Sequence, residues 1–173
     1  IMTMAKGLSS GYQPISACVL GGDIADTIRD ADQEMVHGFT YAGHPVAAAV
    51  ALKNIEILER DGLVGPAAQP RIDAFHKALD TLKDHPLVGE VRYEGFLGAI
   101  ELAADPATGT PYPPEKKAGY ICREQCLENG LVMRAVRDTM ILCPPLTLTP
   151  AQSLELADKA RKALDGTLKA LQG

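Results

Sequence analysis

Lys6 is the first side chain in the sequence whose setting favours covalent chemistry. It directly follows the apolar run of residues 1–5, which predicts a buried strand, and it precedes Gly7, where the backbone can turn tightly. A lysine held at the end of a rigid strand can lie in a pocket, where desolvation lowers its pKa from about 10.4. An amine of lowered pKa can form an imine with a carbonyl group. The same pattern also fits a solvated lysine, so Lys6 alone predicts no function.

A second candidate segment is HGFTYAGHP, residues 37–45, immediately before a predicted helix. Small residues and the hydroxyl of Thr40 near a helix N-terminus are suited to contact a phosphate group. The alternative is a structured loop in which Thr40 and His44 make local hydrogen bonds. Taken by itself, the segment fits the structured loop better.

The remaining sequence predicts the elements that position these residues. A second strand is expected at residues 17–20, and Asp23 is expected to cap a short helix that ends near residue 31. Residues 33–43 predict a loop. A helix follows from the His44-Pro45 pair to residue 58. Beyond it, the expected order is a helix at 66–83, a strand pair at 88–93 and 96–102, a helix at 115–129, a strand pair at 131–135 and 140–143, and a long helix after Thr149-Pro150.

Composition excludes several classes of function. Of the 173 residues, 46% are hydrophobic and 23% are charged, as in ordinary globular proteins. A net charge of −5 without a basic cluster argues against nucleic acid or an anionic membrane as the partner. No apolar run approaches the roughly 20 residues of a membrane helix, and no secretory signal is present. The four scattered cysteines predict reduced thiols rather than a metal site, and therefore a cytoplasmic protein.

Taken together, AKGLSSGYQPI (residues 5–15) and HGFTYAGHP resemble the class III (omega) pyridoxal-phosphate aminotransferases, in particular the amine:pyruvate and omega-amino-acid:pyruvate group. Segments 89–92, 98–102, 130–134 and 144–146 fit the same family. The resemblance implies an α/β fold, namely the C-terminal part of a fold-type I transferase. Residues 1–60 would be the C-terminal remnant of the large cofactor-binding domain, and residues 61–173 the small α+β domain.

The resemblance also implies roles for individual residues. Lys6 matches the lysine that forms the Schiff base with pyridoxal 5′-phosphate and then moves the proton between the substrate Cα and the cofactor. Thr40 matches the threonine that contacts the cofactor phosphate of the neighbouring subunit in a homodimer, and Phe39 is expected close to that site. Arg134 matches the mobile arginine that binds the carboxylate of the keto-acid acceptor.

The sequence departs from the family pattern in three respects. Ala42 stands where a serine is common, and Tyr93 stands where a glycine is expected after Val-Arg. The family's glycine-serine phosphate loop, its ring-stacking aromatic residue and its pyridinium-binding aspartate are all expected upstream of Ile1. The chain is therefore interpreted as a fragment that lacks the N-terminal half of the enzyme and is inactive alone.

The expected reaction is transfer of an amino group from an amine or omega-amino acid to a keto acid such as pyruvate, at a site on the interface of a dimer or a dimer of dimers. Two alternatives stay open at this point. One is another class III reaction, of the ornithine aminotransferase or aminomutase kind. The other is an inert fragment that acts only as an interaction module.

Overall fold

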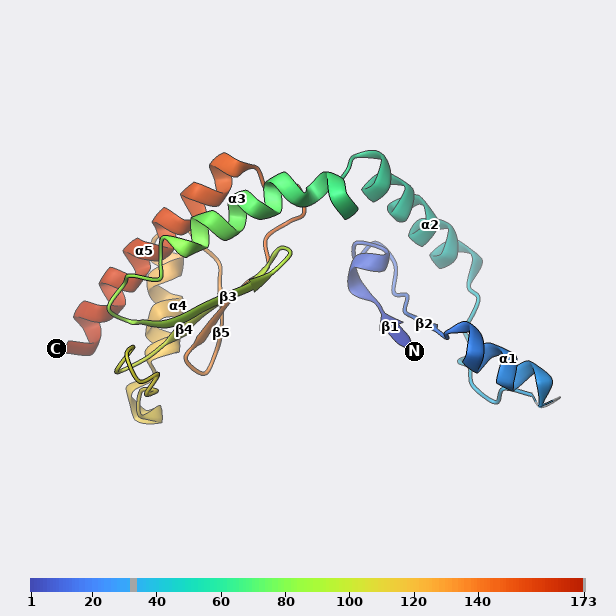
Figure 1. Cartoon of the computed structure of the whole chain (residues 1–173), viewed down its shortest axis with the longest axis horizontal. Coiled ribbons are helices and arrows are strands. Elements are labelled where there is room, and N and C mark those ends of the chain that lie inside the picture. The colour runs from blue at the N-terminus through green and yellow to red at the C-terminus, as the bar shows by residue number, and fades with distance from the viewer. Residues whose placement is uncertain (32–33, 173) are drawn as a thin grey trace. The chain divides into compact units, whose positions relative to one another are not determined.

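Residues 1–31 and 34–172 are described in the computed structural model, and they divide into two units. Unit 1 is Ile1–Val64 and unit 2 is Gly65–Gly173. Figure 1 labels the helices and strands of both. The sequence predicted a boundary after residue 60, and the observed division follows Val64. The assignment of the two parts to a large and a small domain stays a prediction.

Unit 1 combines a two-stranded sheet with two helices. Strands β1 and β2 are antiparallel, with Thr3 opposite Cys18. The sequence predicted a buried first strand. The described residues do not bury it, because Met2 is 62% exposed. The elements of unit 1 are β1 (Met2–Met4), the short 3-10 helix η1 (Lys6–Leu8), β2 (Ala17–Val19), α1 (Gly22–Asp30) and α2 (Pro45–Arg60).

The helices of unit 1 confirm one predicted start and correct another. Helix α2 begins at Pro45 as expected, and the ring Nδ1 of His44 accepts the N–H of Ala47 at 3.4 Å. Asp23 does not cap α1: Gly21 is the cap residue, and Asp23 lies within the first turn, where its charge favours the helix dipole. The loop predicted at 33–43 starts at Gln33, which lies outside the described residues; residues 34–43 form a loop with turns.

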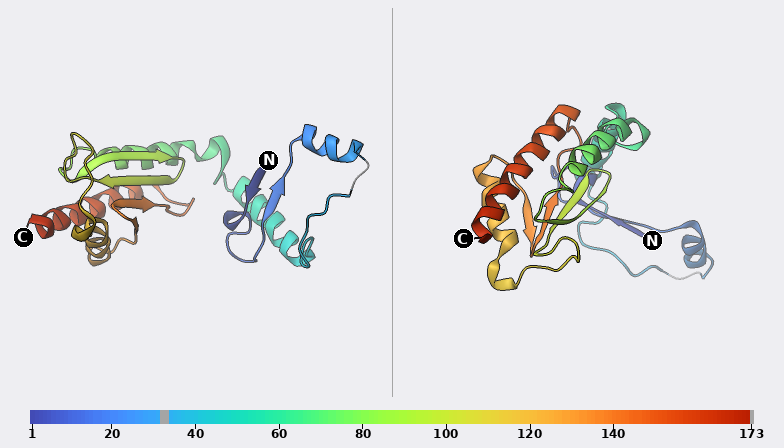
Figure 2. Two further views of the ribbon diagram at one scale, coloured as in Figure 1. Left: turned by 90° about the horizontal axis from the view of Figure 1, so that it is seen from below. Right: turned by 60° about the vertical axis from the view of Figure 1, so that its left-hand side comes forward.

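Unit 2 is a four-stranded antiparallel sheet in the order β3-β4-β6-β5, with helices packed on one face (Figure 2). The predicted pairing of each strand with its neighbour in the sequence is confirmed, including Glu94 opposite Leu97 next to the turn. The elements are η2 (Gly65–Ala68), α3 (Gln69–Asp80), β3 (Val88–Glu94), β4 (Leu97–Leu102), η3 (Pro114–Lys116), α4 (Ala118–Glu128), β5 (Arg134–Val136), β6 (Thr139–Leu142) and α5 (Pro150–Gln172).

The hydrophobic core of unit 2 lies between this sheet and its helices. The three-or-four spacing on α3 predicted an apolar face, and Phe75 and Leu79 are fully buried there. From the sheet, Ile100 and Met140 pack into the same core. Strand residues alternate between buried and accessible positions, so one face of the sheet meets the helices and the other remains open.

Backbone conformation explains where predicted boundaries in unit 2 were too wide. The helix expected from residue 115 begins at Ala118, because Lys117 has φ +52° and interrupts the helix. The strand expected from residue 131 begins at Arg134, because the N–H of Leu131 donates to the Cys126 carbonyl and completes the end of α4.

No helix in the described part of the chain combines the length and apolarity needed to cross a membrane.

Candidate functional site

The predicted lysine lies in a tight turn directly after β1. Lys6 opens the 3-10 helix η1 and has φ +49°, in the left-handed region that side chains other than glycine rarely adopt. This conformation costs about 1–2 kcal/mol relative to ordinary backbone. Local hydrogen bonds oppose that strain: the Leu8 N–H donates to the Ala5 carbonyl at 3.1 Å, and the Ser9 N–H donates to the Lys6 carbonyl at 3.3 Å.

A side chain from α2 also holds this turn. The Asn54 amide Nδ2 donates to the carbonyl oxygens of Gly7 at 2.8 Å and Leu8 at 3.2 Å. Its Oδ1 accepts the hydroxyl of Ser10 at 2.7 Å. The sequence did not predict this contact. In the sequence, Asn54 is a polar residue in an Ala-, Val- and Leu-rich helix. That pattern does not indicate which groups the amide will bind.

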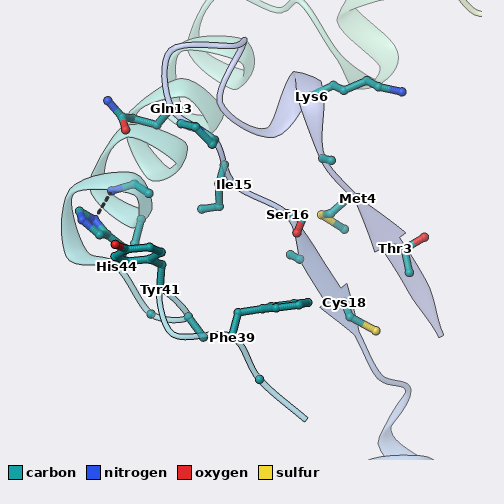
Figure 3. A pocket seen from close by; sticks show the side chains of 18 of the residues that line it. Thr3, Met4, Lys6, Gln13, Ile15, Ser16, Cys18, Phe39, Tyr41 and His44 are labelled. Atoms are coloured by element: carbon teal, nitrogen blue, oxygen red, sulfur yellow. Dashed lines mark hydrogen bonds between the residues drawn. The ribbon is translucent and has the colours of Figure 1, made fainter.

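Lys6 and Phe39 line one open cleft of about 1330 Å³ within unit 1. Figure 3 shows the Phe39 ring directed across the cleft toward β2, while the Lys6 side chain leaves its turn on the side away from Phe39 and Tyr41. The cleft is formed by residues of β1 and its following turn, of β2 and its preceding loop, and of the segment that leads into α2. Its lining includes Thr3, Met4, Gln13, Ile15, Ser16, Cys18, His37, Tyr41, His44 and Ala47.

The segment before α2 is ordered by its own contacts. The His37 and Phe39 rings meet edge to face, with centroids 5.9 Å apart, and the Ala42 N–H donates to the Phe39 carbonyl at 2.9 Å. His44 caps α2, which is the local role that the structured-loop alternative gave it. Thr40 is exposed and does not line the cleft, so its contact with a phosphate stays a prediction.

The side chain of Lys6 is exposed among the described residues. The desolvated pocket expected for it is therefore not formed by this part of the chain. The amine is accessible for reaction, and the turn that carries it is held by the hydrogen bonds from Asn54 to the Gly7 and Leu8 carbonyls.

Arg134 belongs to unit 2, whereas Lys6, Phe39 and Thr40 belong to unit 1. It opens the edge strand β5 opposite Ile141, and its side chain is exposed on the open face of the sheet. No ion pair is found for Arg134 within the described ranges. By contrast, Arg92 on the same sheet is bound by Glu101 and Glu90, which raise the pKa of its guanidinium.

The hairpin that carries Arg134 is anchored to α4 at both ends. The Asp138 carboxylate accepts the N–H of Gly119 at 3.0 Å, at the first turn of α4. Near the other end of the helix, the Cys126 thiol lies 3.7 Å from the sulfur of the buried Met133. Arg137 lies in the turn between β5 and β6, with φ +54°.

The residues present fit the part of pyridoxal 5′-phosphate that they are expected to hold. An amine that can form an imine with the cofactor's aldehyde projects from a fixed turn, and a cleft beside it has an aromatic wall. In the described ranges, no group of three or more His, Cys, Asp or Glu side chains is placed to bind a metal ion.

The family model described as Aminotransferase class-III matches residues 1–164. The chain is 45% identical over 171 residues to the putrescine–pyruvate aminotransferase of Pseudomonas aeruginosa, covering 99% of this chain and 37% of that protein. A thermostable omega transaminase mutant from Pseudomonas jessenii superposes with a TM-score of 0.88 at 36% identity, covering 99% of this chain and 39% of that one. The PMP-bound form of a Vibrio fluvialis aminotransferase gives 0.86 at 34% identity, covering 96% and 37%. The predicted α/β fold of a transaminase is confirmed by these superpositions.

Proposed function

This chain belongs to the class-III aminotransferase family, and we propose that the protein containing it transfers an amino group from an amine or omega-amino acid to a keto acid such as pyruvate. The chain spans about 37% of the length of the curated relative from Pseudomonas aeruginosa, so the activity is proposed for the whole protein. The observation that carries the proposal is the strained, hydrogen-bonded turn that presents the Lys6 amine beside the cleft.

Lys6 has two roles in this proposal. Its amine binds the aldehyde carbon of pyridoxal 5′-phosphate, which family members use as their cofactor. When bound, the cofactor supplies an electron sink that stabilises negative charge at the substrate Cα. When it is not bound to the cofactor, the Lys6 amine would accept the proton from the substrate Cα and later return one.

Thr40 and Phe39 act at the rim of the site. The Thr40 hydroxyl donates to the cofactor phosphate of the neighbouring subunit in a homodimer, and Phe39 packs beside it. The position of Phe39 on the cleft wall supports its part of this proposal.

Arg134 binds the carboxylate of the keto-acid acceptor. Its guanidinium can donate two parallel N–H bonds to a carboxylate, and it is exposed on the open sheet face. Its availability supports this assignment, because Arg92 on the same face already binds two carboxylates.

Two further parts of the proposal concern the donor and the assembly. The name of the Pseudomonas aeruginosa relative makes putrescine the first donor to test. The exposed apolar side chains of unit 1, such as Val36 at 95% and Tyr41 at 81%, support its packing against further polypeptide of the same enzyme and a second subunit. A cytoplasmic location stays part of the proposal.

The proposed function is tested by alanine formation from pyruvate, with putrescine or an omega-amino acid as donor, using the full-length protein. We expect ping-pong kinetics and loss of activity in Lys6→Ala. Arg134→Ala should raise the KM for pyruvate and leave the KM for the amine donor unchanged, while Arg92→Ala on the same sheet face is the matched control. Full activity of Lys6→Ala would contradict the proposal.

A further inference from the structure

Asn54 is the side chain that ties the Lys6 turn to α2. Its amide makes three hydrogen bonds to the segment that follows Lys6: two are donated to the Gly7 and Leu8 carbonyls, and one is accepted from Ser10. Asn54 is half-buried. The Ser10 hydroxyl donates to Oδ1, which fixes the amide with its Nδ2 toward the two carbonyls.

Asn54 does not line the cleft, whereas Lys6 does. Any influence of Asn54 on the lysine therefore passes through the backbone of the turn. The direction in which a side chain leaves the backbone is set by φ and ψ, and Lys6 has an unfavourable φ of +49°. If the turn relaxed to ordinary backbone, the lysine amine would point elsewhere.

Two of the backbone hydrogen bonds of the turn are long. The Ser9 N–H reaches the Lys6 carbonyl at 3.3 Å, and the Ser10 N–H reaches the Gly7 carbonyl at 3.4 Å. The bond from Asn54 to the same Gly7 carbonyl is shorter, at 2.8 Å. The turn also has the Leu8 N–H bond to the Ala5 carbonyl at 3.1 Å and the Ser9 hydroxyl bond to the Gln13 carbonyl at 2.6 Å. Asn54 adds a hold from α2 at the Gly7 carbonyl, where the turn's own bond is weakest.

We propose that Asn54, oriented by Ser10, is a positioning residue that keeps the Lys6 turn in its left-handed conformation and so aims the amine at the carbonyl group with which it reacts. This inference rests on the proposed role of Lys6. It predicts that Asn54 affects the reaction of Lys6 itself, and not the binding of the amine or keto-acid substrate.

The test compares Asn54→Ala and Asn54→Asp in the full-length protein with Asn129→Ala. Asn129 is a matched control, because its Nδ2 also donates to a backbone carbonyl, that of Gln125 at 2.8 Å, but in unit 2. Asn54→Asp keeps the size of the side chain and replaces the donating amide by an oxygen that faces two carbonyls. A folded Asn54→Asp thus keeps the test valid if Asn54→Ala fails to fold.

Two measurements are made on each variant. One is the rate at which cofactor-free protein forms the visible-absorbing imine with added pyridoxal 5′-phosphate. The other is kcat with the KM for the amine donor and the KM for pyruvate, each measured with the second substrate saturating. We expect both the imine rate and kcat of the Asn54 variants to fall by roughly 10- to 100-fold, as is typical of a small misplacement of a reacting group, with each KM within about twofold of wild type. Ser10→Ala should show a smaller loss in the same direction.

The inference is overturned if the Asn54 variants form the imine and turn over as fast as Asn129→Ala. Lys6→Ala separates this outcome from failure of the proposed function. If Lys6→Ala forms no imine and the Asn54 variants behave as wild type, then only the role of Asn54 is wrong. If Lys6→Ala still forms the visible-absorbing imine at the wild-type rate, through a different lysine, the proposed function is wrong as well.

Discussion

The two units differ in how they bury their hydrophobic side chains. Among the described residues of unit 1, the buried hydrophobic side chains are those of Ala47 and Ala51, whereas unit 2 fully buries large ones such as Phe75, Leu79 and Met140. Unit 2 thus holds a core of its own between sheet and helices. Unit 1, which carries Lys6, is held mainly by backbone and side-chain hydrogen bonds. Lys6 therefore belongs to the unit that buries fewer hydrophobic side chains of its own.

The same contrast holds for the two segments that carry the predicted site residues. Besides its own local hydrogen bonds, the Lys6 turn is held by one amide side chain from α2. The Arg134 hairpin is fixed by the Asp138 contact to α4 and by the burial of Met133. A change of a single side chain should therefore disturb the lysine more readily than the arginine.

The largest expected effect comes from separating the units. Residues 65–172 expressed alone should show cooperative thermal unfolding, because their apolar core is complete, whereas residues 1–64 alone should not. Circular dichroism during heating measures both. Cooperative unfolding of residues 1–64 alone would break the comparison.

A matched pair of leucines, one on a helix of each unit, sharpens the comparison between the two units. Leu79→Ala removes a fully buried side chain of α3 and should lower the free energy of unfolding by about 2–5 kcal/mol. Leu52→Ala removes a side chain of α2 that is 69% exposed, and should change that free energy by less than about 0.5 kcal/mol. Denaturant unfolding of residues 65–172 measures the first, and unfolding of the 173-residue chain measures the second. Equal effects would contradict the exposure of Leu52 in this chain.

Two glycines test how tightly each site segment is packed. A Cβ on Gly119 would lie 1.9 Å from the Arg137 carbonyl oxygen, so Gly119→Ala must displace the hairpin and should destabilise unit 2 by about 1–3 kcal/mol. A Cβ on Gly7 would meet nothing within 4 Å. Gly7→Ala should therefore leave the melting temperature unchanged.

In Gly119→Ala we also expect a raised KM for pyruvate, and an unchanged KM would show that the hairpin position does not govern acceptor binding.

The smallest expected effect is electrostatic. Hydrogen bonds from Lys83 and, less strongly, from Tyr93 hold the pKa of Asp80 below its ordinary value of 3.8. A lowered pKa in the folded state stabilises unit 2 above that ordinary value, and the contribution disappears as the pH falls through the folded-state pKa. Thermal unfolding of residues 65–172 between about pH 5 and pH 2 should show a shallower decline in Asp80→Asn than in wild type. Parallel curves would contradict this.

The sequence predicted most elements of unit 2, because its apolar residues follow helical and strand periods that burial then satisfies, as on α3 with Phe75 and Leu79. It could not predict the break at Lys117, since a left-handed backbone at a lysine has no local signal. Nor could it predict Asn54, whose partners lie far away in the sequence and meet it only in the folded chain. Lys6, Phe39 and Arg134 were identified by their resemblance to family segments, and their roles remain proposals.

The most direct test of the central claim is to find which residue carries the cofactor. The full-length protein is incubated with pyridoxal 5′-phosphate, reduced with borohydride, digested and analysed by peptide mass. We predict a reduced cofactor adduct on the peptide that contains Lys6, and none on that peptide after prior treatment with an amine donor. An adduct on a different lysine of an active enzyme, with Lys6 unmodified, would contradict the account.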